Sequence, residues 1–135
     1  MIRDDKWLKQ RMEDIWSFLF SDVERKNNVI IKFKGKWKNK FGHIKKLKNK
    51  NTEIGINSFF RNEIIPEEII HLTIAHEIIH YAHGFNSPYT KLFKYPHQGG
   101  VVRKELLRRG FGNSIKEEKE FIKKWPDIYK SLIGK

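Results

Sequence analysis

The chain contains no cysteine among its 135 residues, which excludes disulfide bonds and thiolate ligands for a metal ion. Proline is also scarce, with four residues, and no proline-rich or low-complexity linker divides the chain. We therefore interpret residues 1–135 as one domain, long enough to bury a hydrophobic core. The absence of cysteine agrees with a reducing compartment, and we expect a cytoplasmic protein.

Long hydrophobic runs are missing as well. No apolar stretch approaches the roughly 20 residues that a membrane-spanning helix needs. The first residues, Met1–Lys6, lack the basic and then apolar order of a signal peptide. The sequence therefore predicts a protein without a membrane partner.

Acidic residues are missing from one long basic segment. Between Arg25 and Lys50 there are eleven lysines or arginines and no aspartate or glutamate, within a chain of net charge +12. From position 32 to 41 lysine alternates with aromatic or small residues, so an extended strand would carry its lysines on one face and its aromatic rings on the other. A lysine face binds phosphates by releasing counterions, and exposed rings stack on unpaired bases.

This pattern predicts a surface for nucleic acid, preferably single-stranded DNA, and with it association with the nucleoid. The residues assigned to this surface are Lys32, Lys34, Lys36, Trp37, Lys38, Lys40, Lys45 and Lys46. In the alternative interpretation the aromatic rings belong to the core and the lysines only keep the surface soluble. A second basic cluster either extends the surface or is the solvated face of its own helix; it comprises Arg103, Lys104, Arg108 and Arg109.

The most informative pattern is HExxH, at His76-Glu77-Ile78-Ile79-His80. Two histidines four residues apart project from the same face of a helix, and each can give one ring nitrogen to a single Zn²⁺ ion. Glu77 lies between them and can act as the base for a water molecule at that ion. The motif thus supplies two metal ligands, a base and an open coordination position, which together are typical of a zinc peptidase.

The residues around this motif predict the helix that it requires. Pro66 suits a first helical position, and the acidic Glu67 and Glu68 suit the first turn. Apolar residues then recur at helical intervals, and Gly84 is well placed as the stop. We expect a helix of about 18 residues. The alternative is a helix whose two histidines are merely packed or exposed.

A catalytic zinc site needs a third protein ligand, for which the downstream candidates are His83, His97 and Glu105. His83 follows His76 by seven residues. This spacing is about 10 Å along a helix axis, so His83 cannot share a metal ion with both motif histidines. The loop 85–96 is long enough to bring His97 back over the first helix. We therefore favour His97 as the third ligand, with Glu105 as the main rival.

The remaining periodicity predicts an α+β fold in which a small three-stranded antiparallel sheet packs on helices. An amphipathic helix is expected from Asp4 to about Arg25. The three strands are expected at Val29–Phe33, Phe41–Leu47 and Glu53–Asn57. Residues 48–51 predict a hairpin turn between the last two strands.

The carboxyl-terminal third reads as helices. One helix is expected from Gly99 to Arg109, with Gly110 as its stop and Phe111 packing back. Ser114 and Glu117 predict a capping box for the next helix. Pro126 should interrupt that helix, and a short terminal helix is expected after it.

Three segments between Thr52 and Gly112 resemble the SprT-like zinc metallopeptidases, the Spartan-related family. A strand at residues 53–57 precedes the helix, the sequence 69–80 carries the HExxH motif, and residues 96–111 are similar to the family's His-Gly segment and the helix after it. The resemblance covers nearly half of the chain. It implies a zincin-like fold, one catalytic Zn²⁺ ion, a third zinc ligand at His97 and a catalytic base at Glu77.

Two features depart from the family's pattern. The His-Gly pair reads His97-Gln98-Gly99, so its register differs by one residue, and the Cys-rich zinc ribbon of many relatives is missing. DNA contacts that such a ribbon supplies must be absent here or replaced by other residues.

We therefore expect a zinc-dependent endopeptidase that hydrolyses proteins or peptides, with Glu77 as base and His76, His80 and His97 as ligands. The resemblance and the basic charge together favour proteolysis of proteins crosslinked to DNA. The first alternative is a general small zinc peptidase that does not depend on DNA. The second is a nucleic-acid-binding module with a structural zinc ion, which would need a fourth protein ligand such as Glu105.

Overall fold

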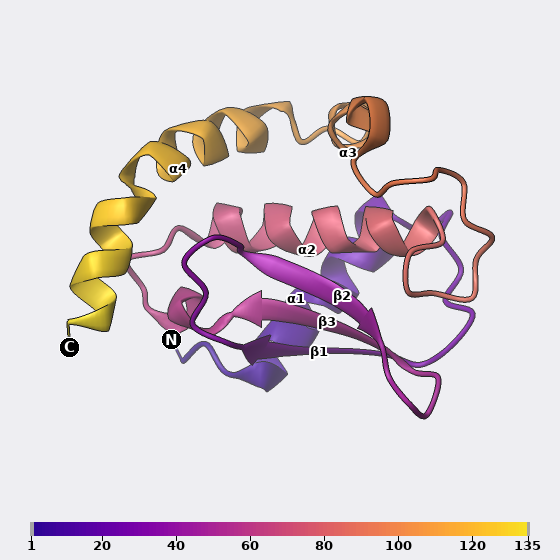
Figure 1. Ribbon diagram of the computed structural model, residues 1–135, viewed down its shortest axis with the longest axis horizontal. Coiled ribbons are helices and arrows are strands. Elements are labelled where there is room, and N and C mark those ends of the chain that lie inside the picture. Colours follow the sequence, from indigo (N-terminus) through magenta and orange to yellow (C-terminus); the bar gives the residue numbers. More distant parts are fainter. Residues whose placement is uncertain (1, 135) are drawn as a thin grey trace.

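The computed structural model describes residues 2–134 and contains four α-helices and one small sheet (Figure 1). The α-helices are α1 (Asp5–Leu19), α2 (Glu67–Ala82), α3 (Val101–Arg108) and α4 (Gly112–Ile133). The strands are β1 (Val29–Lys34), β2 (Gly42–Lys46) and β3 (Thr52–Asn57), and two short 3₁₀ helices are η1 (Ser58–Arg61) and η2 (Gln98–Gly100). The predicted α+β class is confirmed, and each predicted strand lies within a residue of its observed bounds.

The sheet is mixed, which corrects the antiparallel sheet expected from the sequence. Its order is β1-β3-β2, with β3 parallel to β1 and antiparallel to β2. The predicted turn does close the β2–β3 hairpin, where the amide of Lys50 donates to the carbonyl of Leu47. Because β3 inserts between the two earlier strands, β2 becomes an edge of the sheet.

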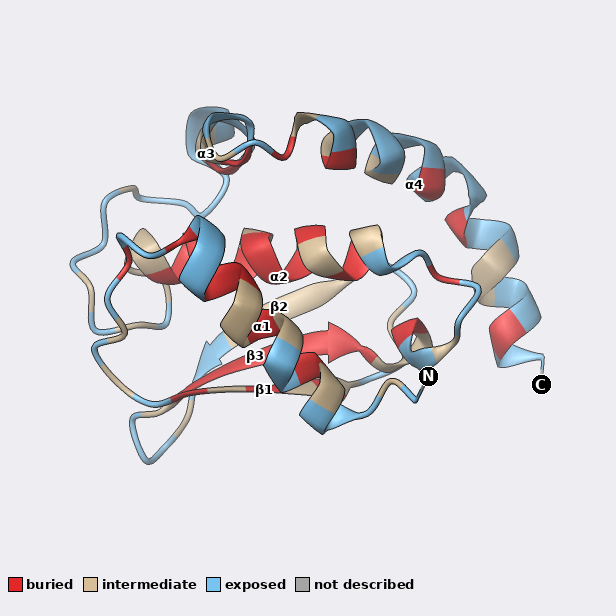
Figure 2. Ribbon diagram, turned by 180° about the vertical axis from the view of Figure 1, so that it is seen from behind, coloured by how far each residue is buried: buried red, intermediate tan, exposed pale blue. Residues whose placement is uncertain are grey.

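Helices α1 and α2 pack on the same face of the sheet. The alternation along the strands turns Ile31 and Phe33 of β1, and Ile54 and Ile56 of β3, into the core beneath these helices. Helices α3 and α4 contact α2 as well, so α2 lies between the sheet and these two helices (Figure 1). Helix α2 is therefore buried along most of its length (Figure 2). Among residues 2–134, no helix is both long and apolar enough to cross a membrane.

Helix α1 is shorter than the sequence predicts. It begins where the Asp4 carboxylate accepts a hydrogen bond of 2.8 Å from the amide of Trp7. It ends at Leu19 instead of continuing to about Arg25, because the chain turns after Phe20. The turn brings Arg25 back along the helix, where its guanidinium forms a bidentate salt bridge with the Glu13 carboxylate.

Helix α4 corrects two further predictions. The proposed capping box is wrong, because α4 begins at Gly112 and the Ser114 hydroxyl donates to the Glu68 carboxylate at the start of α2. Pro126 lies inside the helix and does not end it. Figure 1 shows α4 bending along its course, as expected where proline removes a helical hydrogen bond. The stop of α3 at Gly110, with Phe111 buried behind it, is confirmed.

A group of aromatic rings fixes α4 against the loop that enters β2. Trp125 of α4 packs edge-on against Phe41 and Phe60, with ring centroids 5.4 and 5.7 Å away. Its indole nitrogen donates a hydrogen bond of 2.7 Å to the carbonyl of Lys38. Burying an aromatic ring of this kind contributes about 2–3 kcal/mol. These contacts hold α4 opposite β2, with α2 between them.

Candidate metal centre and its cleft

Helix α2 provides the frame for the HExxH motif. Pro66 is the residue before the helix and the acidic Glu67 and Glu68 form its first turn. At the other end Gly84 adopts a φ of 87°, and the amides of Gly84 and Phe85 donate to the carbonyls of Tyr81 and His80. This pattern of bonds is a Schellman motif, for which glycine is the preferred residue. The helix that the motif requires is present, with 16 residues where about 18 were expected.

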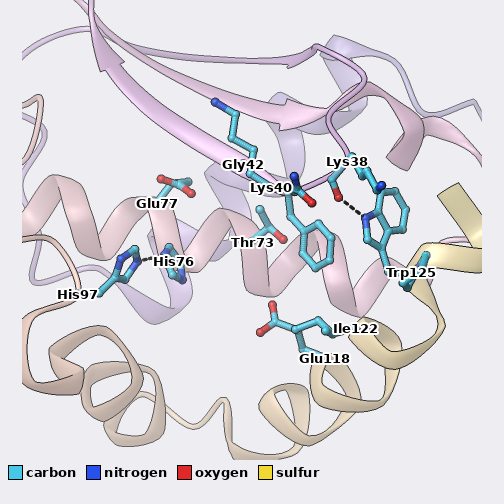
Figure 3. A pocket seen from close by; sticks show the side chains of 13 residues that line it. Lys38, Lys40, Gly42, Thr73, His76, Glu77, His97, Glu118, Ile122 and Trp125 are labelled. Atoms are coloured by element: carbon cyan, nitrogen blue, oxygen red, sulfur yellow. Dashed lines mark hydrogen bonds between the residues drawn. The ribbon is translucent and has the colours of Figure 1, made fainter.

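Three histidines converge at the surface of α2. His76 and His80 come from the helix, and His97 comes from the loop that precedes η2. One ring nitrogen of each lies within 4.8 Å of the others, and Nε2 of His76 is 2.9 Å from Nε2 of His97 (Figure 3). Within residues 2–134 this is the one group of three or more histidine or acidic side chains with such a spacing.

The chemistry of these rings fits a metal ion. Burial lowers the pKa of His76 to about 4 and that of His80 to about 3, and the neighbouring His97 acts in the same direction. Both rings are therefore neutral at pH 7 and have lone pairs to donate. Nitrogen atoms that share a tetrahedral zinc ion lie about 3.3 Å apart, and the separations of 2.9 to 4.8 Å bracket this value.

An unpaired nitrogen in the same cluster supports this fit. Nδ1 of His80 is buried and has no hydrogen-bond partner among the described residues. A buried polar atom without a partner typically costs about 1–3 kcal/mol. A metal ion coordinated by Nδ1 itself would offset this cost.

The segment that carries His97 is exposed and depends on few contacts. Its start is held where the amide of Leu92 donates to the carbonyl of His83, and where the Phe93 ring packs on the His83 ring. Its end is held by Gln98, whose side-chain oxygen accepts from the amides of Lys94 and Tyr95. The position of the third histidine is therefore the least rigidly supported of the three.

Glu105, the rival for the third position, faces other partners. Its carboxylate accepts hydrogen bonds from Arg108 and Arg109, and the Arg108 bond is the largest influence that lowers its pKa. Arg109 continues the network to Asp22 and stacks on Phe20, with its guanidinium carbon 4.3 Å from the ring centroid. Glu105 thus ties α3 to the end of α1 and does not join the histidines.

Glu77 points from α2 towards β2 and is only 5% exposed. Burial raises its pKa to about 8, while the charge of Lys40 acts in the opposite direction. At neutral pH this carboxyl group therefore mostly holds a proton, and a cation bound at the neighbouring histidines would favour the ionised form that a base requires. In Figure 3 Glu77 and His76 lie on the same stretch of α2, at the end of the cavity that His97 also lines.

A cavity of about 520 Å³ opens beside Glu77 and the histidines. Helix α2 contributes Thr73, His76 and Glu77, and β2 contributes Gly42. Helix α4 forms the opposite wall with Glu118, Ile122, Trp125 and Pro126. A second cavity of about 250 Å³ extends beneath α3 and shares His76, His97 and Glu118 with the first. Both cavities therefore meet at the histidine cluster.

The free edge of β2 borders this cleft. In the β2–β3 ladder Asn57 donates to Phe41 and Leu47 donates to Asn51, so alternate residues between them face away from β3. Gly42, Ile44 and Lys46 consequently direct their backbone groups to the open edge, and the Ile44 carbonyl accepts a hydrogen bond from the side chain of Asn86. Gly42 lies beside Glu77, because a methyl group on its Cα would stand 3.2 Å from Oε2 of that side chain.

The residues predicted to bind nucleic acid do not form one continuous strand face. Strand β1 ends at Lys34 and Gly35 adopts a φ of 72°, so residues 32–41 are not one extended strand and the condition for a single lysine face is not met. Phe33 and Phe41 belong to the core or pack against it, as the alternative interpretation holds. The predicted set falls into three groups: Lys32, Lys34 and Lys45 on the open sheet face, Lys36, Trp37, Lys38 and Lys40 in the following loop, and Lys46 on the other side of β2.

The open sheet face has a buried acid at its centre. Glu53 of β3 accepts from Lys34 at 3.0 Å and lies 3.3 Å from Lys32 and 3.2 Å from His43. Burial acts to raise the pKa of Glu53, but the bonds from Lys34, His43 and Lys32 outweigh it and lower that pKa to about 2. Two of the lysines assigned to nucleic acid thus already have an ionised partner.

Sequence reasoning missed the residues that α4 contributes to the cleft. Ser114, Glu118, Phe121 and Trp125 follow one another at intervals of four, three and four, so they form one face of α4. Ser114, Phe121 and Trp125 are buried. The position of Glu118 on the same helix face as these buried residues could have indicated its role. It lies within the charged run 116–120, however, which is typical of a solvent-exposed surface.

Comparisons of the chain with protein-family models, with curated proteins and with solved structures found no match. The resemblance to SprT-like peptidases therefore rests on the motif and the segments around it, and it stays a prediction.

Proposed function

We propose that this chain is a zinc-dependent peptidase of the SprT-like kind. His76, His80 and His97 would hold one Zn²⁺ ion, and Glu77 would serve as the base. The observation that carries the proposal is the convergence of three imidazoles beside a buried carboxyl group, at a cleft bordered by a free sheet edge. An open cleft at the ligands is what distinguishes a catalytic zinc site from a structural one.

The chemistry divides between the ion and the chain. When bound, a Zn²⁺ ion lowers the pKa of a coordinated water molecule and polarises a substrate carbonyl. Glu77 would take the proton of the attacking water, hold it on its carboxyl group, and deliver it to the leaving amine.

The free edge of β2 supports a protein or peptide as the substrate class. An extended peptide can add to this edge as a further strand, using the amide and carbonyl of Gly42 and the amide of Ile44, whose carbonyl already accepts from Asn86. Such pairing places the main chain of the substrate between β2 and the histidines. Main-chain hydrogen bonds read no particular side chain, which suits an endopeptidase that acts on unfolded or extended segments.

The proposal is tested by incubating zinc-loaded protein with an unfolded protein such as casein and following new fragments by mass spectrometry. We expect fragments with zinc, none after chelation, and recovery when zinc is restored. The His71→Ala variant, altered on the same helix away from the cluster, controls for nonspecific damage and should cleave as the wild type does. Fragmentation that survives complete removal of metal would contradict the proposal.

A second element of the proposal is association with DNA. Its support is the net charge of +12 and the position of Lys32, Lys34 and Lys45 on one open face with the part-exposed Trp37 nearby. Glu53 limits this charge but does not cancel it, because three lysines surround one carboxylate. A basic DNA-binding protein should then be cleaved faster when single-stranded DNA is present.

This element has its own test. Cleavage should depend on DNA and fall as salt rises, because phosphate contacts release counterions. Lys45→Glu should weaken DNA binding more than Lys104→Glu on α3, which changes the net charge equally. Cleavage at the same rate with and without DNA would leave a general zinc peptidase. Bound zinc without any cleavage would favour the module with a structural ion.

A further inference from the structure

Glu118 is an unpaired carboxylate inside the cleft. It lies on α4 and lines both cavities at the point where they meet His76 and His97. Figure 3 shows its carboxylate directed from α4 into the cavity, towards α2. Within residues 2–134 it forms no hydrogen bond or ion pair. It is partly buried, whereas the acidic residues next to it on α4 are exposed to solvent.

Among residues 2–134 no basic side chain pairs with Glu118, although Lys38, Lys40 and Arg103 also line the two cavities. Lys40, on the opposite wall, extends away from the cavity past β2 (Figure 3), and its ammonium lies 4.3 Å from the centroid of the Trp37 ring. Burial alone raises the pKa of Glu118, with no contribution from a nearby cation. The cleft therefore contains a negative group whose partner is missing, and a cationic group from outside the chain would complete it.

The surroundings of Glu118 define the shape of that cationic group. One turn further along α4, Ile122 is half-exposed to the cavity and Trp125 forms its floor. Phe41 adds a third apolar surface on the side of the entering strand. Lysine and arginine place a long apolar stem along such a surface and a charge at its end. Glu118 is not one of the candidate metal ligands, because only His76, His80 and His97 have ligand atoms within 4.8 Å of one another.

We propose that Glu118, with Ile122 and Trp125, forms a subsite for a lysine or arginine side chain of the substrate. The inference rests on the proposed function, because it assigns specificity to that same cleft. Glu118 pairs with the charged end of the side chain, and the two apolar residues hold its stem. Charge-assisted bonds of this kind are shorter and stronger than neutral ones.

The direction of β2 decides which side of the scissile bond this residue occupies. Strand β2 starts at Gly42 beside Thr73 and runs towards Asn86, beyond the end of α2. Antiparallel pairing, which is slightly more stable than parallel pairing, gives an added peptide the opposite direction. The substrate's carboxyl-terminal half then lies at the Gly42 end, where Trp125 and Glu118 line the cavity. The basic residue therefore follows the scissile bond.

A binding experiment tests the subsite without requiring turnover. Blocked fluorescent peptides of alanine and glycine, with one variable residue, are titrated into the zinc-loaded Glu77→Gln protein and followed by anisotropy. Arginine and lysine peptides should bind about tenfold more tightly than the norleucine peptide, which has a similar stem and no charge. Glu118→Gln should remove this preference, and Glu118→Lys should transfer it to a glutamate peptide.

Glu117→Gln is the matched control, because it changes the net charge equally at the neighbouring exposed position of α4. It should leave the preference for basic peptides unchanged. Equal loss in both variants would show that general electrostatic attraction is responsible, and would overturn the inference. Loss of zinc in Glu118→Gln would also overturn it, because Glu118 would then be a metal ligand.

The outcome separates the subsite from the proposed function. If the wild-type protein hydrolyses no peptide but still binds basic peptides through Glu118, the subsite stands and the peptidase assignment fails. If it hydrolyses neutral and basic peptides equally well, with cleavage sites unrelated to lysine or arginine, the peptidase assignment stands and the subsite fails.

Discussion

Gly42 on β2 lies so close to Glu77 on α2 that a methyl group on it would stand 3.2 Å from Oε2 of that carboxyl group and 2.7 Å from Cγ2 of Thr73. The second distance is shorter than any ordinary contact between carbon atoms. A glycine is therefore required here for space, because any side chain would push β2 away from α2. The closeness places the backbone of an edge strand directly over the proposed base.

Replacing Gly42 with alanine should consequently separate β2 from α2. We expect Gly42→Ala to lower the free energy of unfolding by about 1–3 kcal/mol, as overpacked substitutions do. Thr73→Ser removes Cγ2 and keeps the hydroxyl group that donates to the Ile69 carbonyl. The free energy of unfolding of the double variant should exceed the value expected from adding the two single effects by at least about 0.5 kcal/mol. Urea unfolding of all four proteins measures this coupling, and strict additivity would mean that the two residues do not collide.

Removal of the third histidine should weaken metal binding and leave the fold intact. The His97 segment is exposed, so His97→Ala removes a ligand without opening the core. Zinc at about 100 times its dissociation constant should stabilise the wild-type protein by about 2.7 kcal/mol. This gain should largely disappear in His97→Ala and persist in His71→Ala, and thermal unfolding with and without zinc measures both. An undiminished zinc effect in His97→Ala, together with a loss in Glu105→Ala, would move the third ligand to Glu105.

The acid at the centre of the open sheet face predicts a dependence of stability on pH. The pKa of Glu53 lies at about 2 in the folded protein, below the ordinary value of 4.5. The unfolded chain thus binds a proton first as pH falls, so the stabilisation is fully present above pH 4.5 and is lost as pH falls towards 2. Its size at neutral pH is roughly 1–3 kcal/mol, because the lysine partners are partly exposed.

Urea unfolding of wild type and Glu53→Gln at several pH values between about 6 and 3, on either side of the ordinary glutamate pKa, checks this expectation. The difference in unfolding free energy between the two proteins should shrink steadily below pH 4.5. A Glu13→Gln control should show a smaller change, since the Glu13–Arg25 pair is more exposed. A difference for Glu53→Gln that stays constant with pH would show that the Glu53 carboxylate is not held ionised by its partners.

The strand order, with β3 parallel to β1, is one part of the fold that the sequence did not predict. Strand β3 alternates apolar and polar residues, which is typical of a strand with one solvated face, yet all of it is buried. The polar side is covered by partners from elsewhere: Glu53 by lysines of β1, and Asn57 by the carbonyls of Trp37 and Lys40, which accept from its amide. These contacts join residues far apart in the chain, and no local pattern reveals them.

The candidate site shows the same division between local and distant information. The helical period predicts that His76, Glu77 and His80 lie on one helix, and the length of the loop 85–96 favours His97 as the third ligand. Glu118 could not be chosen, because its role depends on α4 running along the cleft. That course is set by the aromatic contacts of Trp125 and by Ser114 bonding to Glu68.

The central claim is that the histidines hold a metal ion while Glu77 performs the proton transfer, and one measurement separates these roles. Zinc content and peptide hydrolysis are determined by mass spectrometry on the same sample of Glu77→Gln, beside Glu67→Gln on the exposed first turn of α2. The account predicts one zinc ion per chain in both variants, with hydrolysis abolished in Glu77→Gln and retained in Glu67→Gln. Hydrolysis at the wild-type rate by zinc-loaded Glu77→Gln would contradict it.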